Sequence, residues 1–209
     1  MGKEGCGVLA ATSLSEVVEA IEAARGSDRL LVGIAGEPGA GKSTIAALLV
    51  ASLGPTAALL PMDGYHLPQQ RLRELGRRDR MGAPDTFDVP GFFDAIARVK
   101  NSGSTQFAND FDREIEEPVP NAIAFQPELL TIVVEGNYLL LWPEVHELLD
   151  LTFFVEVEPA TRQQRLIERH IRFGKTADEA RAWALGPDET NAGVIRASSN
   201  GADVVIRLP

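Results

Sequence analysis

The sequence contains few of the residues that cross-link or metallate a small protein. Its 209 residues include a single cysteine, Cys6, and three histidines. One cysteine cannot form an internal disulfide, and a structural zinc cluster needs several cysteine and histidine ligands at short spacings. We therefore expect neither feature, and the cysteine content suits a reducing compartment.

Long apolar runs are also missing. The longest uncharged apolar stretches, such as residues 45–53, are too short to cross a bilayer. Lys3 and Glu4 stand near the start of the sequence, and no apolar signal core follows them. We therefore expect a cytoplasmic protein with no membrane partner.

Positive charge is scarce. The chain has 20 lysines and arginines against 30 aspartates and glutamates, a formal net charge of −10. Such a field repels polyanions, so nucleic acid is not an expected partner. With 44% hydrophobic and 24% charged residues, the composition is that of a globular protein, and we expect one domain over residues 1–209. The sequence leaves the oligomeric state open, a homodimer included.

Apolar runs that alternate with helical patterns predict an α/β fold. Continuous apolar runs bounded by turn residues are typical of strands buried on both faces of a parallel sheet. They occupy residues 30–35, 57–60, 130–134 and 151–155, with a shorter run at 203–208. A capping-box pattern predicts a helix that starts after Ser13, and residues 187–198 are also expected to be helical. Residues 101–120, with Gly103, Pro118, Pro120 and mixed charge, are expected to form an irregular insertion or loop. We predict a mostly parallel sheet sandwiched by helices.

Residues 36–43 carry the strongest functional signal. They read GEPGAGKS and match the phosphate-loop pattern G-x-x-x-x-G-K-[ST] between a predicted strand and a predicted helix. In such a loop, backbone N–H groups surround phosphate oxygens and the helix N-terminus adds partial positive charge. Lys42 is expected to reach the β- and γ-phosphates, and the Ser43 hydroxyl to bind Mg²⁺. The alternative is a glycine-rich turn without a ligand. The residues predicted to hold the nucleotide are Gly36, Glu37, Pro38, Gly39, Ala40, Gly41, Lys42, Ser43 and Thr44.

Two acids follow predicted strands at the same edge of the sheet. Asp63 can take the proton from an acceptor hydroxyl that attacks the γ-phosphate, or it is a turn residue before Gly64. Glu135 stands where a P-loop protein usually places its second metal-binding acid, or it is a turn acid beside Gly136. The chain has no Asn-Lys-x-Asp element, which disfavours a guanine-specific switch protein.

Arginines recur at helical spacing after Pro159. Arg162, Arg165, Arg169 and Arg172 are three, four and three residues apart, which predicts that they share one face of a helix. Such a cationic ridge suits a lid that closes over phosphates, with Gly174 as a hinge and Lys175 as a further cation. The alternative is a solvated helix face that Glu158 and Glu168 partly balance.

Several motifs together resemble the superfamily of uridine kinases, phosphoribulokinases and bacterial pantothenate kinases. They are the phosphate loop, MDGYH at 62–66, GAPDTFD at 82–88, EGNYL at 135–139 and the helix with Arg165, Arg169, Gly174 and Lys175. The chain looks most like the branch of fructose-transport-system and nucleoside kinase-like proteins. The resemblance spans about residue 30 to the C-terminus and implies a P-loop fold with a helical lid at about residues 159–186. It further implies an ATP- and Mg²⁺-dependent kinase with Asp63 as base, Lys42 and Ser43 at the phosphates and metal, and Arg165 and Arg169 in the lid, with Arg162 as a further candidate there.

The acceptor implied by the resemblance is a small molecule with a hydroxyl, such as fructose or another polyol. Gly82 and Ala83 replace the Asp-His pair that uridine kinases usually carry, which argues against uridine, and the chain is short for a pantothenate kinase. Uridine or another nucleoside, pantothenate, and a non-kinase ATPase switch stay as alternatives. The candidate acceptor residues are Tyr65, His66, Arg80, Asp85 and Asp88, and each has a structural alternative as a packing, turn, cap or solvated residue. The adenine pocket is expected near residues 198–203.

Overall fold

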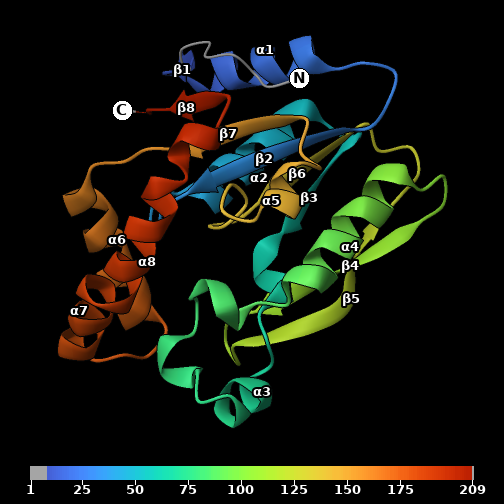
Figure 1. Cartoon of the computed structure of the whole chain (residues 1–209). Helices are drawn as coiled ribbons and strands as arrows, with labels where there is room; N and C mark the ends of the chain where they lie inside the picture. Colours follow the sequence, from blue (N-terminus) through green and yellow to red (C-terminus); the bar gives the residue numbers. More distant parts are fainter. Residues whose placement is uncertain (1–8, 209) are drawn as a thin grey trace.

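A six-stranded parallel sheet forms the centre of the molecule (Figure 1). The computed structural model describes residues 9–208, and Cys6 lies outside them. The strands follow the spatial order β1-β8-β7-β2-β6-β3, and every neighbouring pair is parallel. Their bounds are β1 (Leu9–Ala11), β2 (Leu30–Gly36), β3 (Ala57–Pro61), β6 (Thr131–Glu135), β7 (Leu151–Val155) and β8 (Val204–Ile206). The predicted α/β fold with a parallel sheet is confirmed; the three-residue β1 was not predicted.

β2 is buried along its whole length because helices cover both faces of the sheet. Its alternate side chains enter different cores: Val32 and Ile34 pack with α1 (Leu14–Ala24) and α2 (Lys42–Leu53). Leu31 packs with α4 (Val89–Asn101) and α5 (Pro143–His146) on the opposite face. Burial on both faces explains why the strand reads as a continuous apolar run.

β6 lies between β2 and β3 and is parallel to both, so the carboxyl ends of these three strands lie next to one another. Glu135, the last residue of β6, pairs in register with Ile34 of β2 and with Pro61 of β3. The phosphate-loop sequence follows β2, and Asp63 follows β3 in the short 3₁₀ helix η1 (Met62–Tyr65). Three segments that the sequence predicted to be functional therefore meet at one edge of the sheet.

Three helices after β7 stack on one side of this edge (Figure 1). They are α6 (Pro159–Arg172), α7 (Ala177–Leu185) and α8 (Pro187–Ala197), followed by the 3₁₀ turn η4 (Ser199–Gly201). The segment predicted as a lid, residues 159–186, folds as α6 and α7. A complete capping box starts α7, in which the Glu179 carboxylate accepts a hydrogen bond from the Thr176 N–H at 2.9 Å.

The prediction of an irregular insertion at residues 101–120 is wrong. Helix α4 runs to Asn101, and β4 (Gln106–Asp112) and β5 (Glu117–Phe125) then form an antiparallel pair with a bulge between Ala108 and Asp110. This segment, called the hairpin below, lies opposite the helices α6, α7 and α8 (Figure 1). The prolines of β5 misled the prediction, because a two-stranded sheet has only edge strands, in which proline needs no outward hydrogen bond.

The connection from β3 to α4 also lies beside the hairpin. It contains η1, α3 (Gln69–Glu74) and the 3₁₀ turns η2 (Arg78–Arg80) and η3 (Pro84–Thr86).

Near the N-terminus, Ser13 caps α1 as predicted, but the Glu16 carboxylate accepts the N–H of Thr12 rather than that of Ser13. None of the helices within residues 9–208 is both long and apolar enough to cross a membrane.

Candidate active site

The phosphate loop has the conformation that anion binding requires. Gly39 and Gly41 adopt φ angles of +80° and +89°, a left-handed region that strains residues with a side chain. The Ala40 N–H donates to the Glu37 carbonyl at 3.1 Å, which closes the turn. Gly41 is the N-cap of α2 and offers no side-chain cap, so the first N–H groups of the helix stay available for an anion.

Lys42 lies inside this turn. Its side chain is buried, and Nζ donates to the Glu37 carbonyl at 3.1 Å. Burial lowers the pKa of Lys42, against the opposing effect of the carboxylates of Glu135 and Asp63. The ammonium is thus held at the loop and has only one carbonyl partner among the described residues, which leaves donors for phosphate oxygens.

Ser43 and Glu135 offer oxygen atoms for a metal. The Ser43 hydroxyl donates to Oε2 of Glu135 at 3.2 Å, so α2 and the end of β6 are in contact. Burial raises the pKa of Glu135, and Lys42 opposes this effect. Within residues 9–208, no three His, Cys, Asp or Glu side chains group as a metal cage. A hydroxyl and one carboxylate fit Mg²⁺, which takes few protein ligands and completes its shell with water and substrate phosphates.

Asp63 points its carboxylate toward side chains rather than toward a helix N-terminus. Its Oδ2 accepts a hydrogen bond from Nη2 of Arg113 at 2.6 Å, and Nε2 of His66 lies 3.9 Å from Oδ1. Burial alone would raise the pKa of Asp63, but the nearby His66, Arg113 and Lys42 outweigh it and lower the pKa. Asp63 is therefore ionised at neutral pH and can accept a proton.

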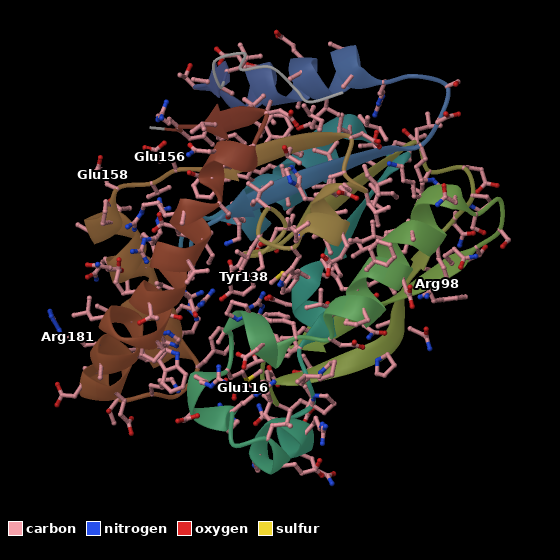
Figure 2. The ribbon with its side chains drawn as sticks, in the orientation of Figure 1. Arg98, Glu116, Tyr138, Glu156, Glu158 and Arg181 are labelled. Carbon is pink, nitrogen blue, oxygen red and sulfur yellow. The ribbon has the colours of Figure 1, made fainter. Side chains whose placement is uncertain are left out.

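A cleft of about 170 Å³ unites these groups between the hairpin and the helices α6 to α8. Of the residues that the sequence predicted, it is lined by Pro38, Lys42, Ser43, Asp63, His66, Glu135, Arg169 and Lys175. The sequence analysis did not predict the other lining residues whose side chains could bind or react with a ligand: Arg78, Arg113, Glu116, Asn137, His170, Trp183, Asp188 and Asn191. Figure 2 shows Glu116 and Tyr138 in this region, whereas Arg181 points away from the molecule on the outer side of α7.

Arg113 could not have been found from local sequence. It lies in the turn of the hairpin, 50 residues from Asp63, in a segment predicted to be irregular. The backbone of the hairpin sits directly on the residue after Asp63, because a Cβ added at Gly64 would lie 2.4 Å from the Asn109 carbonyl oxygen. Gly64 is thus required for the close approach that brings Arg113 to Asp63.

Among the five residues predicted for the acceptor, all of them described, His66 lines the cleft and the others do not. Tyr65 is buried, packs on Phe92, and its hydroxyl accepts the Asn109 N–H at 3.4 Å. It contacts the hairpin rather than the cleft.

The other three predicted acceptor residues have structural partners at the surface. Arg80 and Asp85 form an ion pair with each other, with a 2.6 Å contact between Nη2 and Oδ2. Asp88 caps α4, since its carboxylate accepts the Gly91 N–H at 3.1 Å. A role of these residues and of Tyr65 toward an acceptor stays a prediction.

The arginines of α6 do not form one continuous exposed ridge. Arg162 is fully buried and forms ion pairs with Glu37 and Glu189. Arg165 reaches the phosphate loop, with Nη1 3.7 Å from the position of a Cβ on Gly41, and Arg169 lines the cleft. Arg172 is exposed. The prediction of a shared face holds for the helix geometry, but Arg162 points into the protein because α6 packs directly on the phosphate loop.

A network of ion pairs ties the phosphate loop to α6 and α8. The carboxylate of Glu37 accepts hydrogen bonds from Nε and Nη2 of Arg196 at 2.7 and 2.9 Å, and Nε of Arg162 lies 2.8 Å from it as an ion pair. Glu189 binds Arg162 from the other side. Sequence reasoning assigned Glu37 to the nucleotide, and in the structure it also anchors two helices.

A second pocket, of about 730 Å³, opens beyond the phosphate loop at the ends of β7 and β8. It is lined by Glu37, Arg165 and Arg196 and, from η4, by Ser199 and Asn200. It coincides with the place expected for an adenine pocket near residues 198–203, and Glu37 connects it to the phosphate loop.

Comparison with known proteins agrees with this geometry. No family model matches the chain. A Schizosaccharomyces pombe protein provisionally named uridine kinase C227.14 is 31% identical over an alignment of 177 positions that covers 78% of this chain and 75% of that protein. The chain belongs to the superfamily of uridine kinases, phosphoribulokinases and bacterial pantothenate kinases.

Two further relatives support membership in this superfamily. The Aspergillus versicolor ATP-dependent kinase-like protein notR′ is 36% identical to this P-loop kinase over an alignment of 133 positions that covers 58% of this chain and 77% of that protein. The crystal structure of a protein from Silicibacter sp. TM1040, provisionally named fructose transport system kinase, superposes with a TM-score of 0.86 at 33% identity. It covers 93% of this chain and 99% of that one. The protein is thus an ATP-dependent kinase.

Proposed function

We propose that this P-loop kinase transfers the γ-phosphoryl group of ATP to a hydroxyl of a small polar molecule. One observation carries the proposal: the phosphate loop, Glu135 and Asp63 come from three neighbouring strand ends, and Lys42, Glu135 and Asp63 line a single cleft. This arrangement supplies phosphate binding, a metal-binding carboxylate and a base within one site.

The nucleotide half of the site is built by the phosphate loop and α6. The backbone N–H groups of the loop and Lys42 hold the phosphates, and the pocket lined by Ser199 and Asn200 takes the adenine. Ser43 and Glu135 would hold Mg²⁺, which when bound neutralises charge on the β- and γ-phosphates. Arg165 and Arg169 project from α6 toward the loop and the cleft, where they stabilise the charge that spreads over the transferred group.

Asp63 performs the proton transfer. It accepts the proton of the acceptor hydroxyl as the hydroxyl oxygen forms a bond to the γ-phosphorus, and the bond from phosphorus to the bridging oxygen of ADP breaks. Because Arg162 anchors α6 to the phosphate loop, we place the moving part of the lid beyond Gly174, in α7, rather than over the whole of residues 159–186.

A sugar such as fructose is the first acceptor to test. The Silicibacter relative carries fructose transport in its name, and the cleft is lined mainly by polar and charged side chains, which suits a hydroxylated molecule. Uridine or another nucleoside and pantothenate are the alternatives. Relatives carry the names uridine kinase and pantothenate kinase. This chain matches only about half the length of the pantothenate kinase from Enterococcus faecalis.

A screen of acceptor-dependent ADP release tests the proposal. Purified protein with ATP and Mg²⁺ is assayed against sugars, polyols, nucleosides and pantothenate. A kinase gives strong stimulation by one chemical class, and a phosphorylated product appears in equal amount to ADP. The competing function, an ATPase that acts as a regulatory switch, gives a slow rate that no acceptor changes, and this result would overturn the proposal.

A further inference from the structure

We propose that the acceptor carries an anionic group, a carboxylate or a phosphate ester, close to the hydroxyl that is phosphorylated, and that Arg113 and Lys175 bind this group. The inference rests on the proposed function, because it takes Asp63 as the group that faces the hydroxyl, and it narrows the acceptor from a neutral sugar such as fructose to a hydroxylated molecule that also carries an anion, such as a sugar acid or a sugar phosphate. Arg113 and Lys175 stand on opposite walls of the cleft, one on the hairpin and one before α7.

Arg113 is bound to the candidate base itself. Nη2 lies 2.6 Å from Oδ2 of Asp63, and the Arg113 side chain is still 44% exposed. A guanidinium carries five N–H donors, so Arg113 can keep its bond to Asp63 and donate to a second anion in the cleft. An acceptor whose hydroxyl reaches Asp63 therefore places its neighbouring atoms beside Arg113.

Charge balance during the reaction favours an anion at this position. When Asp63 takes the hydroxyl proton, its negative charge disappears and Arg113 loses its counter-charge. The Asp63 side of the pair is only 25% exposed, so water shields Arg113 incompletely there and a second anion is favoured beside it. A carboxylate or phosphate of the acceptor supplies the missing charge, whereas a neutral polyol does not.

The position of Arg113 is fixed by the fold. The hairpin backbone at Asn109 touches Gly64, which follows Asp63 directly, and the Asn109 N–H donates to the Tyr65 hydroxyl at 3.4 Å. These two contacts of Asn109 hold β4, at its bulge, against the segment that carries Asp63, and the turn that follows β4 brings Arg113 to the carboxylate.

Lys175 provides positive charge from the opposite wall. Its Nζ lies 4.6 Å from the centroid of the Trp183 ring, and no carboxylate of residues 9–208 lies within ion-pair distance. Glu179 is nearby, but its carboxylate serves the N-terminus of α7, where it accepts the N–H and hydroxyl of Thr176 at 2.9 and 2.7 Å. An aromatic face holds the ammonium in place without neutralising it.

The other cations around the acceptor side of the cleft already have acidic partners. Arg78 is paired with Glu116, and Nε2 of His170 lies 2.7 Å from Oδ2 of Asp188. Arg169 has no ion-pair partner among the described residues, and it belongs to the α6 face that we assign to the phosphates of ATP. Within residues 9–208, Lys175 is thus the cation of the cleft that has neither an acidic partner nor an assigned role toward ATP, and Arg113 is the cation whose partner, Asp63, loses its charge in the reaction.

Paired acceptors that differ in one charged group test the inference. The pairs are glycerate with glycerol, gluconate with glucose, and fructose 6-phosphate with fructose, assayed as ADP release with saturating ATP and Mg²⁺. We expect the anionic member of at least one pair to have a kcat/KM about 10- to 100-fold above its neutral partner, as a charge-assisted contact to a cation would give. The carboxylate and phosphate pairs distinguish the two anions.

Variants then assign the effect to the two residues. Arg113→Gln and Lys175→Gln should each reduce the ratio between anionic and neutral acceptors by about tenfold, mainly through KM, whereas Arg113→Lys and Lys175→Arg should retain most of it. Arg181→Gln, on the outer side of α7, is the matched control and should leave the ratio unchanged (Figure 2). Equal use of both members of every pair, or a ratio that neither Gln variant changes, would overturn the inference.

A binding measurement separates this inference from the proposed function. If no acceptor stimulates ADP release, the kinase proposal fails, and the same compounds are titrated by calorimetry into protein saturated with a non-hydrolysable ATP analogue. Binding of glycerate, gluconate or fructose 6-phosphate that Arg113→Gln and Lys175→Gln weaken supports the anion site. No binding of any of the three contradicts it.

Discussion

Arg162 of α6 is fully buried, and its Nε lies 2.8 Å from Oε2 of Glu37 in the phosphate loop. The sequence predicted that α6 closes over the nucleotide as part of a lid. In the structure, this ion pair already joins α6 to the phosphate loop. The two residues stand 125 positions apart in the sequence, since 162 − 37 = 125. The sequence around each of them gives no sign that they are in contact.

Glu37→Gln should destabilise the protein strongly. The substitution leaves the buried guanidinium of Arg162 with only Glu189, and breaking a buried ion pair by removing one partner costs about 3–5 kcal/mol. Urea unfolding at neutral pH measures the loss. Glu156→Gln is the matched control, because Glu156 pairs with Arg207 at an exposed site (Figure 2) and such pairs contribute about 1 kcal/mol or less. Equal unfolding midpoints for the two variants would contradict the structural role of Glu37.

Lys42→Ala should abolish turnover. The ammonium is held inside the phosphate loop, and removing one preorganised charge that stabilises transferred negative charge costs about 10²- to 10³-fold or more in kcat. Steady-state ADP release with a working acceptor measures the effect. Arg98→Ala, an exposed cation on α4 (Figure 2), should keep full activity, and a Lys42→Ala protein with near-normal kcat would refute the assignment.

Asp63→Asn should slow turnover and leave ATP binding almost intact. The amide cannot accept the hydroxyl proton, and a positioned base contributes about 10²- to 10⁴-fold, whereas the phosphate loop and Lys42 stay in place. Single-turnover kinetics with calorimetric titration of ATP separates the two steps. Asp94→Asn, at an exposed site on α4, serves as control. Unchanged turnover in Asp63→Asn would show that another group takes the proton.

Arg113→Gln should move the acid limb of the pH profile to higher pH. Burial favours a raised pKa for Asp63, but His66, Arg113 and Lys42 together lower it. A base must be ionised, so activity falls as pH drops through the pKa of Asp63. Without the guanidinium the pKa rises, and the fall begins at a higher pH. Profiles of kcat/KM between about pH 4 and 8 for the parent, Arg113→Gln and the exposed control Arg98→Gln measure the shift. Superimposable acid limbs would exclude this coupling.

Gly64→Ala should damage catalysis through the hairpin. The added Cβ would lie 2.4 Å from the Asn109 carbonyl oxygen, so the hairpin must move away from η1 and take Arg113 with it. We expect a clear rise in the KM of the acceptor, with faster amide exchange in β4 and β5. Gly193→Ala is the control, because nothing lies near its Cβ within α8, and it should raise stability by about 0.5–1 kcal/mol. Equal activity in both variants would argue against a hairpin role.

The nucleotide half of the site could be predicted from the sequence because its signals are local. The apolar run at 30–35, the glycines and Lys42 of the phosphate loop, and the following helix are adjacent in the chain, and their spacing encodes the turn directly. Glu135 was found in the same way, as an acid at the end of a continuous apolar run. The order of the sheet then brings it to Ser43, as the 3.2 Å hydrogen bond shows.

The acceptor half could not be predicted because its contacts are remote in the sequence. Arg113 meets Asp63 through a hairpin whose prolines concealed its strands, and Lys175 faces the same cleft from beyond α6. Asp88 shows a second difficulty of local reasoning: the sequence offered it both as an acceptor residue and as a cap, and in the structure its carboxylate caps α4. Short polar side chains stabilise helix starts and bind ligands with the same atoms, so the sequence alone does not separate the two uses.

The division between sheet and hairpin has a consequence for engineering the acceptor site that we propose. The phosphate loop and Glu135 lie at the ends of parallel strands, whereas β4 and β5 form a separate ladder that meets the segment around Asp63 through Gly64, Tyr65 and Arg113. Under the proposed function, exchanging residues 106–125 for the corresponding stretch of a relative is expected to change acceptor choice and to leave the strands that carry the phosphate loop in place.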